Sequence, residues 1–395
     1  MGYIMIKVGI IGGGYSGVIS AIYASKNSEV TILERNPSLL KKLLLTGNGR
    51  CNYFNEDMSL DKFHSSNESY IKEILTKENI KEVVDFYYRL GLFSKVKNGY
   101  YYPYSNHASS VRDLLIGKLK ELNVNIKTDY LVNKIEKYND KFIINDELEF
   151  DKIIIGTGGM AYPKTGSDGI GYELLKDFNH NITKLSPSLV QIKSNNKYLK
   201  ELSGIRCESK LTLFKNNEIV KKEIGELQFT DYGISGICTF NLSSRLDDKN
   251  DNQYILINFM PISIKDFDLF MKSSSNTIFE RLEGFLNYKL VKVLLKISSI
   301  SEDKKYSEIT NKQKEDLINN LFNYRVNIIG TKSFDNSQVT KGGLDLNEIN
   351  PLTMESKKVK GLYVVGEILD LDGDCGGYNL TIAFVTGLIA GTNIW

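Results

Sequence analysis

Apolar residues at the start of the chain are grouped in a way that predicts two short buried strands around one helix. Residues 8–11 form an almost uninterrupted apolar run, which is typical of a strand covered on both faces. Residues 18–26 are compatible with a helix, and residues 30–33 form a second run rich in β-branched side chains. A strand, a helix and a strand of these lengths predict the beginning of a parallel α/β sheet.

Helical and strand-like patterns then alternate up to about residue 187. Apolar positions recur at helical spacing in residues 71–92, which predicts two amphipathic helices, and again in residues 111–122. Strands are predicted at residues 125–129, 130–136 and 151–159, the last of which ends in four small residues. This alternation indicates that one α/β domain continues through the region.

The middle of the chain has a different pattern. Short alternating runs separated by Asn and Gly turns predict antiparallel strands, and helical spacing returns after them. Thr310 and Gln313 have the spacing of a capping box at one of these helices. We therefore predict a Rossmann-like domain at residues 1–187 and 336–395, an inserted β-rich, barrel-like domain at residues 188–262, and a helical subdomain at residues 263–335.

The α/β pattern resumes near the end of the chain. Residues 361–367 form a buried strand that ends in an acid, Glu367, and an apolar helix is predicted from about residue 380. Gly376 and Gly377 precede that helix. A glycine-rich helix start presents free N–H groups and the positive end of the helix dipole, so we expect a second site for an anion here.

The glycine turn after the first strand carries the most specific chemical signal. Gly12 permits a tight turn, Gly14 lets the backbone approach a pyrophosphate, and Gly17 lets the helix pack closely on the strand. Glu34 ends the second strand, where a carboxylate binds the ribose hydroxyls of a dinucleotide and repels the 2′-phosphate of NADP. The alternative is an ordinary strand-to-helix turn, but the flanking strand and helix are those that a dinucleotide site requires.

Two further stretches could contact a ligand. Residues 41–55 form a loop rich in Gly and Asn, which is either part of a ligand site or a surface turn. Tyr100, Tyr101, Tyr102 and Tyr104 surround one proline and form either a packed edge or the wall of a pocket. Both pairs of alternatives stay open at this level.

Composition limits the kinds of partner. Of the 395 residues, 42% are hydrophobic and 25% are charged, and the formal net charge is +2, so no long-range field favours nucleic acid. No CxxC pair and no complete calcium loop are present, so we predict no metal site and no disulfide framework, and a reducing cytoplasm fits best. The N-terminus lacks a cleavage site, and the apolar tail at residues 380–394 is too short to span a membrane.

Several separated motifs together resemble a known family over nearly the whole chain, the bacterial FAD-binding oxidoreductases of the BaiN-like type, which include aminoacetone oxidase. They are the glycine turn with Glu34 and Arg35, and residues 46–52, 156–159, 162–167, 229–236, 353–357 and 361–379. Asp231 stands where many members carry histidine, and Cys375 where several carry threonine. These two departures leave the substrate open.

The resemblance implies a glutathione-reductase-type nucleotide fold that binds FAD in an extended form. It implies that Glu367 meets the ribitol and that amides of residues 377–379 reach the pyrimidine edge of the flavin. A helix start there favours the negative charge of reduced flavin. The predicted FAD residues are Gly12, Gly14, Tyr15, Ser16, Gly17, Glu34, Arg35, Lys42, Thr46, Gly47, Asn48, Arg50, Cys51, Val132, Thr157, Gly158, Gly366, Glu367, Gly376, Gly377, Tyr378 and Asn379.

The expected activity is that of an FAD-dependent oxidoreductase. A small organic substrate would give hydride to flavin N5, and oxygen or another acceptor would reoxidise the flavin. Candidate catalytic residues are Cys51, Tyr162, Lys164 and Asp370, with Tyr102 as a further pocket group. No histidine lies in a recognised motif, so a mechanism centred on histidine is not expected.

Three alternatives belong to other classes. The first is a reductase that uses NAD(P)H, although residues 166–171 have the wrong spacing for a second fingerprint, so no dedicated NAD(P)H domain is predicted. The second is a flavin-dependent nucleic-acid modifier, which the near-neutral charge and the lack of a basic-aromatic stripe disfavour. The third is a non-catalytic flavin sensor, which an insertion suited to covering a pocket over the flavin disfavours. The expected partner is therefore a small molecule, with no nucleic acid and no membrane.

Overall fold

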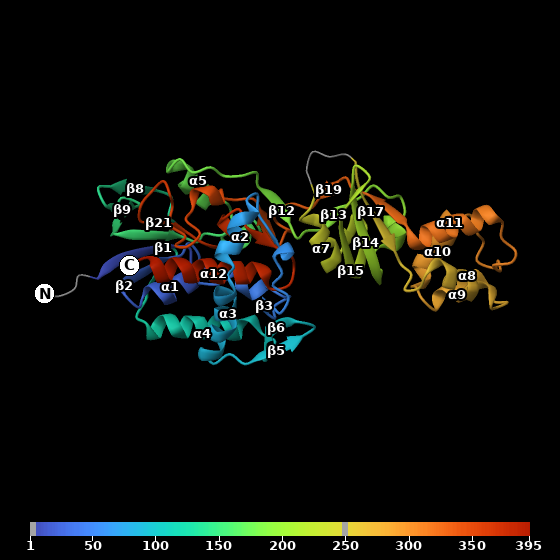
Figure 1. The fold of residues 1–395 in the computed structure, drawn as a ribbon, viewed down its shortest axis with the longest axis horizontal. Helices are drawn as coiled ribbons and strands as arrows, with labels where there is room; N and C mark the ends of the chain where they lie inside the picture. The colour runs from blue at the N-terminus through green and yellow to red at the C-terminus, as the bar shows by residue number, and fades with distance from the viewer. Residues whose placement is uncertain (1–4, 247–251) are drawn as a thin grey trace. The chain divides into compact units, whose positions relative to one another are not determined.

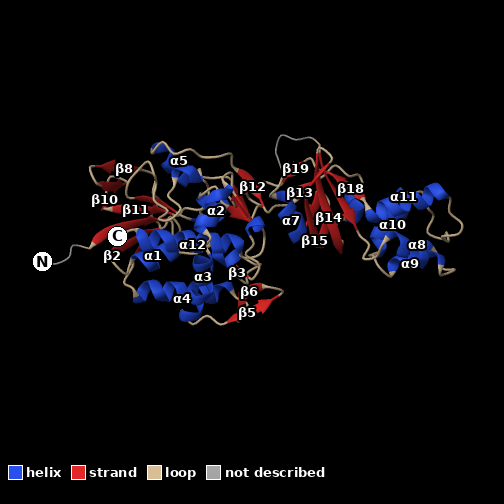
Figure 2. Cartoon of the chain, viewed as in Figure 1, coloured by secondary structure: helices blue, strands red, loops and turns tan. Residues whose placement is uncertain are grey.

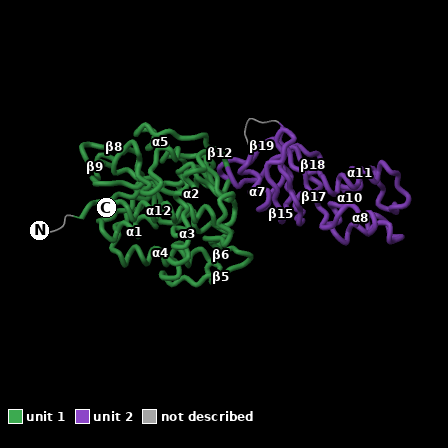
Figure 3. The backbone as a smooth tube through the Cα atoms, viewed as in Figure 1, with its two compact units in different colours: residues 1–187, 337–395 green, residues 188–336 purple. Residues whose placement is uncertain are grey.

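The computed structural model describes residues 5–246 and 252–395, which form two compact units. One unit consists of Met1–Pro187 and Ser337–Trp395, and the other of Ser188–Asn336 (Figure 3). The chain leaves the first unit once and returns to it, so this unit combines the two ends of the sequence. The β-rich and the helical parts of the insertion belong to one unit.

A five-stranded parallel sheet forms the centre of the first unit, with the strand order β21-β11-β1-β2-β7 (Figure 1). Val8 of the central strand pairs with Val30 on one side and with Lys152 on the other. The strand order therefore reverses next to β1, and such a switch point is where open α/β sheets bind ligands. The strands are β1 (Ile6–Ile11), β2 (Ser28–Leu33), β7 (Asn125–Lys127), β11 (Lys152–Ile155) and β21 (Leu362–Val364).

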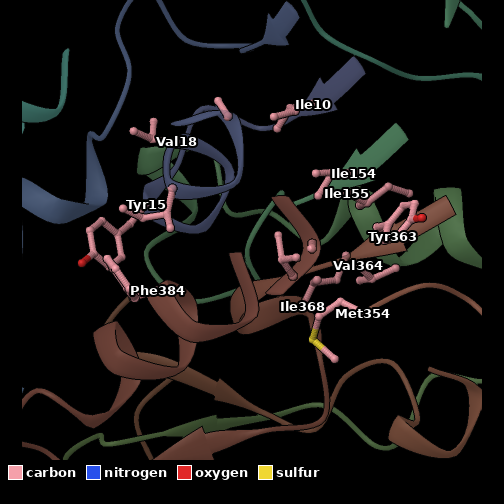
Figure 4. Close-up of a cluster of buried hydrophobic side chains, with 14 of the residues drawn as sticks. Ile10, Tyr15, Val18, Ile154, Ile155, Met354, Tyr363, Val364, Ile368 and Phe384 are labelled. Carbon is pink, nitrogen blue, oxygen red and sulfur yellow. The ribbon is translucent and has the colours of Figure 1, made fainter. Parts of the chain in front are cut away.

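Two helices from opposite ends of the chain, α1 (Tyr15–Ala24) and α12 (Tyr378–Asn393), lie side by side on this sheet (Figure 1). Glycines let their backbones come close, because a Cβ at Gly387 would lie 2.7 Å from the carbonyl oxygen of Ser16. Figure 4 shows the buried cluster around them, in which Tyr15 and Phe384 lie near each other. Among the described residues, no helix is long and apolar enough to cross a membrane.

Smaller elements surround the parallel sheet in the first unit (Figure 2). The helices are α2 (Glu68–Ile74), α3 (Lys77–Arg89), α4 (Ala108–Glu121) and α5 (Ile170–Asp177). The strands are β3 (Phe54–Asn55), β4 (Phe63–His64), β5 (Ser94–Lys97), β6 (Tyr100–Pro103), β8 (Ile135–Tyr138), β9 (Lys141–Ile144), β10 (Leu148–Phe150), β12 (Ser186–Ser188), β20 (Val339–Lys341) and β22 (Asp372–Gly373). The pairing of β22 with β4 joins the two ends of the sequence a second time.

The second unit contains an antiparallel sheet with the order β18-β17-β14-β15-β16-β13-β19. Its strands are β13 (Ile192–Lys193), β14 (Arg206–Lys215), β15 (Glu218–Thr230), β16 (Gly233–Ser235), β17 (Gln253–Asn258), β18 (Tyr324–Asn327) and β19 (Gly330–Thr331). Its helices are α6 (Leu199–Leu202), α7 (Ile237–Ser243), α8 (Ile264–Lys272), α9 (Ile278–Glu283), α10 (Tyr288–Ile297) and α11 (Asn311–Phe322). The predicted capping box of Thr310 and Gln313 is confirmed at the start of α11.

The α/β fold is confirmed, but one predicted strand is wrong. Residues 130–134 do not join a sheet, and the strand begins only at Ile135. The reason is the side chain of Asn145, whose Oδ1 accepts hydrogen bonds from the N–H groups of Asn133 and Lys134, and whose Nδ2 donates to the carbonyl oxygen of Leu131. These side-chain bonds satisfy the backbone that a neighbouring strand would otherwise pair with.

A buried histidine makes the stability of this unit depend on pH. The ring of His180 lies 2.8 Å from Glu348 Oε2 and 3.0 Å from Ser356 Oγ, and burial lowers its pKa. The folded protein thus takes up a proton on this ring less readily than the unfolded chain, so stability is highest above the ordinary histidine pKa of about 6.5 and falls as the pH drops below it. Urea unfolding of the wild type and of His180→Gln at pH 7.5 and 5.5 should give a shallower pH dependence for the variant. Equal slopes would contradict this assignment.

Candidate functional site

The glycine turn closes the junction between the ends of β1 and β11. Gly12 has a φ of +102°, and a Cβ there would lie 2.6 Å from the carbonyl oxygen of Gly156. A Cβ at Gly17 would overlap the carbonyl oxygen of Gly12. Gly14 differs, because the nearest atom to a Cβ there is 3.8 Å away. The fold itself requires glycine at positions 12 and 17, and it leaves room for a ligand beside Gly14.

The start of α1 is open to an anion. Gly14 is the N-cap, no side chain caps the helix, and the first turn contains no acid. The first N–H groups of a helix have no partner within the helix, so a phosphate can accept hydrogen bonds from them. Tyr15 and Ser16 are both buried in this turn, with Ser16 between the turn and Gly366.

Glu34 is buried against the glycine turn. Its Oε2 accepts a hydrogen bond of 2.7 Å from the N–H of Gly13, and its Oε1 accepts one of 2.7 Å from the N–H of Asn36. Asn36 Nδ2 also donates to Oε1 at 2.6 Å, and the carboxylate still has a lone pair left to accept from a ribose hydroxyl. The N–H of Tyr130 donates to the carbonyl oxygen of Glu34, which brings the segment leading to the buried Val132 beside this acid.

Two buried hydroxyl groups near the end of β11 have no hydrogen-bond partner within the described part of the chain. One belongs to Thr157, which is a predicted FAD residue. The other belongs to Tyr172, which the sequence did not suggest as a site residue. Burial, and then the nearby charges of Glu367 and Asp370, raise the pKa of Tyr172 well above its ordinary value, so this phenol stays protonated. Buried polar atoms are normally satisfied, and a bound ligand is one way to satisfy these two.

Lys42 and Glu367 form an ion pair across 325 positions of sequence. Lys42 Nζ lies 2.9 Å from Glu367 Oε2, and the other carboxylate oxygen accepts from the N–H of Thr340 at 3.0 Å. Both side chains are partly exposed. The structure thus places two predicted FAD residues in contact, next to the loop after β11.

The loop before α12 is packed against the segment that contains β3. Gly377 has a φ of +96°, and a Cβ there would lie 2.7 Å from the backbone of Phe54, while a Cβ at Gly376 would lie 2.8 Å from the ring of Tyr100. The side chain of Asn379 is used within the loop, where its Oδ1 accepts from the N–H of Gly373 at 2.9 Å. The helix start again has no side-chain cap and no acid.

The predicted loop at residues 46–51 folds back on itself. The N–H of Cys51 donates to the carbonyl oxygen of Thr46 at 2.9 Å, and Arg50 Nε donates to the carbonyl oxygen of Gly47 at 3.1 Å. The guanidinium of Arg50 also lies 5.3 Å from the centre of the Tyr102 ring. Asn48 and Arg50 are exposed.

The candidate catalytic residues differ in their burial and in their local contacts. Cys51 is fully buried, and burial raises the pKa of its thiol to about 12, so it does not provide a thiolate at neutral pH. Asp370 is buried and accepts hydrogen bonds from the N–H and the hydroxyl of Ser66, so it holds a loop. Tyr162 is half-buried in a left-handed conformation, and Lys164 is exposed.

Three other predicted residues have contacts that hold local structure. Arg35 NH1 forms an ion pair of 2.5 Å with Asp168. A Cβ at Gly158 would overlap Ser167 Oγ, and the N–H of Gly366 donates to Thr386 Oγ1 at 2.9 Å.

The structure also shows a histidine at the site that the sequence did not suggest. His64 Nε2 lies 3.0 Å from Asp374 Oδ1, and β4 pairs with β22 in this region. Both residues are buried. The contact spans 310 positions and no local motif marks it, so only the folded chain reveals it.

Comparisons with known proteins agree with this geometry. The sequence profile of the family described as HI0933-like protein Rossmann domain matches residues 6–393. The chain is 36% identical, over 402 residues, to a 3-dehydro-bile acid delta(4,6)-reductase of Clostridium scindens, and the match covers 98% of each chain. Ribosomal RNA dihydrouridine synthases of Escherichia coli and Haemophilus influenzae are 27% and 25% identical and match 95% of this chain, with 94% and 95% of their own length covered.

The close approach at Gly17 gives a direct test of the site. In Gly17→Ala the new methyl group would overlap the carbonyl oxygen of Gly12, so the helix must move away from the turn. We expect the purified variant to retain less than about a tenth of the flavin absorbance of the wild type, because the turn and the helix start are predicted to bind the pyrophosphate together. Gly117→Ala, in the exposed middle of α4, is the control, since nothing lies within 4 Å of its Cβ. That change should keep the flavin and add about 0.5–1 kcal/mol of stability. Full flavin content in Gly17→Ala would refute the assignment.

Proposed function

The chain belongs to the HI0933-like Rossmann family of FAD-dependent oxidoreductases, and on this premise we propose that it reduces a carbon–carbon double bond conjugated to a carbonyl group in a small organic substrate. The observation that carries the proposal is the 36% identity to the bile acid reductase over 98% of both chains, combined with a dinucleotide cradle at the switch point of the parallel sheet. Hydride transfer from substrate to flavin, as the sequence suggested, is the alternative.

The names of the relatives describe one kind of chemistry. A delta(4,6)-reductase acting on a 3-dehydro steroid saturates double bonds conjugated to a ketone, and a dihydrouridine synthase saturates the double bond of a uracil ring, which is conjugated to a carbonyl. Each double bond that is saturated takes up a hydride and a proton, which together are two electrons and two protons. We infer that this chain acts on the same functional group.

The residues at the switch point fit FAD. The turn has room beside Gly14, the starts of α1 and α12 have neither a capping side chain nor an acid, and the buried hydroxyl of Thr157 has no hydrogen-bond partner among residues 5–246 and 252–395. When bound, FAD supplies a hydride centre at N5. The protein would hold the pyrophosphate at the start of α1, the ribose at Glu34, and the pyrimidine edge at the start of α12.

The electrons must come from an external donor, and NAD(P)H is the class that we propose. A second nucleotide fingerprint is not predicted from the sequence, so the nicotinamide would use the substrate side of the site without a domain of its own. Glu34 disfavours a 2′-phosphate only in the FAD cradle and therefore does not restrict the choice between NADH and NADPH.

The direction of electron flow is tested with anaerobically reduced protein. Mixed with a 3-oxo-Δ4 steroid in a stopped-flow instrument, the reduced flavin should be reoxidised within a turnover, because the conjugated bond accepts hydride. The matched saturated 3-oxo steroid lacks this bond and should leave the flavin reduced. The oxidase alternative is favoured if both ketones leave the flavin reduced, while oxygen reoxidises it or the saturated ketone reduces the oxidised flavin.

One observation supports a second candidate, the reduction of a nucleobase in RNA. Across four strands of the antiparallel sheet, Lys222, Thr212, Leu256 and Arg325 are paired in one row, so they share a face. In the next row Tyr254 lies between the Phe214 ring, at 5.0 Å, and the Arg325 guanidinium, at 3.6 Å. Residues of this face line a surface hollow of about 330 Å³.

This face is basic and aromatic, although the sequence shows no such stripe. Its members come from different strands and alternate with buried residues, so no short window contains them together. Cations beside aromatic rings suit a single-stranded nucleic acid. The distant relatives named as ribosomal RNA dihydrouridine synthases give this candidate a further reason.

An RNA-binding assay separates the two candidates. If RNA is the substrate, a fluorescent single-stranded oligonucleotide should bind with a strong salt dependence, and Lys222→Gln with Arg325→Gln should reduce the logarithmic salt slope by about one unit each. Lys292→Gln and Lys312→Gln, on α10 and α11, are the controls. The absence of RNA binding at low salt, or an equal decrease of the salt slope in the controls, would contradict the RNA candidate. Only the small-molecule proposal would then remain.

A further inference from the structure

A neighbouring segment contacts the loop that leads into α12 close to the start of the helix. We call residues 370–377 the α12 loop and residues 54–66 the support segment. Asn55 Nδ2 donates to the carbonyl oxygen of Gly376 at 3.0 Å, and the N–H of Asp374 donates to the carbonyl oxygen of Lys62 at 2.9 Å. Contacts at both positions fix the backbone of the loop just before the helix starts.

A buried side-chain contact between His64 and Asp374 also joins the support segment to the α12 loop. Its Nε2 lies 3.0 Å from Asp374 Oδ1, and the two side chains are 8% and 3% exposed. Asp372 is paired with His64 between β22 and β4, so the backbone holds the ring and the carboxylate in register. A buried imidazole and carboxylate in contact are costly to separate, because each would otherwise be left in a poorly solvated place.

The charge of Asp374 acts at the helix start itself. The hydroxyl of Tyr378, the first residue of α12, has its pKa raised by burial and, after that, by Asp57, Tyr100, Asp374 and Asp61. The position of the Asp374 carboxylate therefore matters for the electrostatic potential where α12 begins. The amides and the dipole of this helix start favour a bound anion, whereas the carboxylates of Asp57, Asp61 and Asp374 disfavour it.

We propose that His64 is a positioning residue for the flavin, which acts through Asp374 to fix the start of α12 against the cofactor and so favours the reduced flavin. The inference rests on the proposed placement of the pyrimidine edge of FAD at this helix start. Reduced flavin carries negative charge near N1 and O2, so its binding depends on aligned N–H donors more than the binding of oxidised flavin does. A loop that drifts by a fraction of an ångström weakens the binding of the reduced form most.

The test compares two buried histidines of the same unit. His64→Ala removes the contact to Asp374. His180→Ala removes another buried histidine–carboxylate contact, 2.8 Å from Nδ1 to Glu348 Oε2, which lies outside the α12 loop. The midpoint potential of the bound flavin is measured by anaerobic dye equilibration, alongside the melting temperature and the dissociation constant of FAD. His64→Gln, whose amide can donate to Asp374, serves as the conservative rescue.

We expect His64→Ala to lower the preference for reduced over oxidised flavin about tenfold, which equals a fall of about 30 mV for a two-electron couple. His64→Gln should restore most of it. His180→Ala should lower the melting temperature without moving the potential. An unchanged potential in His64→Ala, or an equal shift in His180→Ala, would overturn the proposal.

A second variant keeps the test decisive if His64→Ala does not fold. Asn55→Ser removes the bond to the carbonyl oxygen of Gly376 and should lower the potential in the same direction, and an unchanged potential there would overturn the proposal as well. The spectrum and the midpoint potential of the wild type are measured with bound FAD and without any substrate. Failure of the steroid reaction would therefore refute the proposed substrate while the outcome for His64 still stands on its own.

Discussion

The packing of Gly12 against the carbonyl oxygen of Gly156 decides where the parts of this site can meet. A side chain at position 12 would separate the ends of β1 and β11, and the positive φ of this residue also favours glycine. The sheet extends from β1 in both directions, so the loops after β1, β2 and β11 come together at this junction. The chain must return to the same place after the insertion, because β21 adds to the outer side of β11. Residues from both ends of the sequence therefore meet at one junction, where we propose that the ligand binds.

The parts of the site that could be predicted from the sequence have local causes. The turn at Gly12 and the N-cap at Gly377 need a positive φ, and Glu34 follows its strand directly. Such features are visible within a short window, and the Rossmann fold that they indicated is confirmed, as is FAD, which the family resemblance implied. The predicted strand at residues 130–136 begins late because of a contact that is not local. The N–H groups of Asn133 and Lys134 donate to the side chain of Asn145, which lies more than ten positions away.

Contacts between distant segments could not be predicted. Lys42 and Glu367 were each expected near FAD, but nothing in either motif indicates that they form an ion pair. His64 contacts Asp374, 310 positions later, and Tyr172 is marked only by a buried hydroxyl that has no hydrogen-bond partner in the described part of the chain. For Cys51 the motif predicted a position near the cofactor, but a cysteine packs as readily in a core as beside a cofactor, and burial is a property of the whole fold.

The helices of this protein start in different ways, and a missing cap does not by itself mark a ligand site, because α4 and α7 also start without a capping side chain or an acid in the first turn. The helices α9 and α11 begin with complete capping boxes, in which side chains satisfy the first N–H groups. The helices α1 and α12 begin at glycine, with no capping side chain and no acid in the first turn. Omitting a cap costs about 1 kcal/mol, so a fold that does this at two buried helix starts must hold them by other contacts. The packing of Gly17 on the turn does so for α1, and the contacts of Asn55 and His64 with the loop do so for α12. Support from outside leaves the helix N–H groups free, and these groups can then bind the anionic parts of a cofactor.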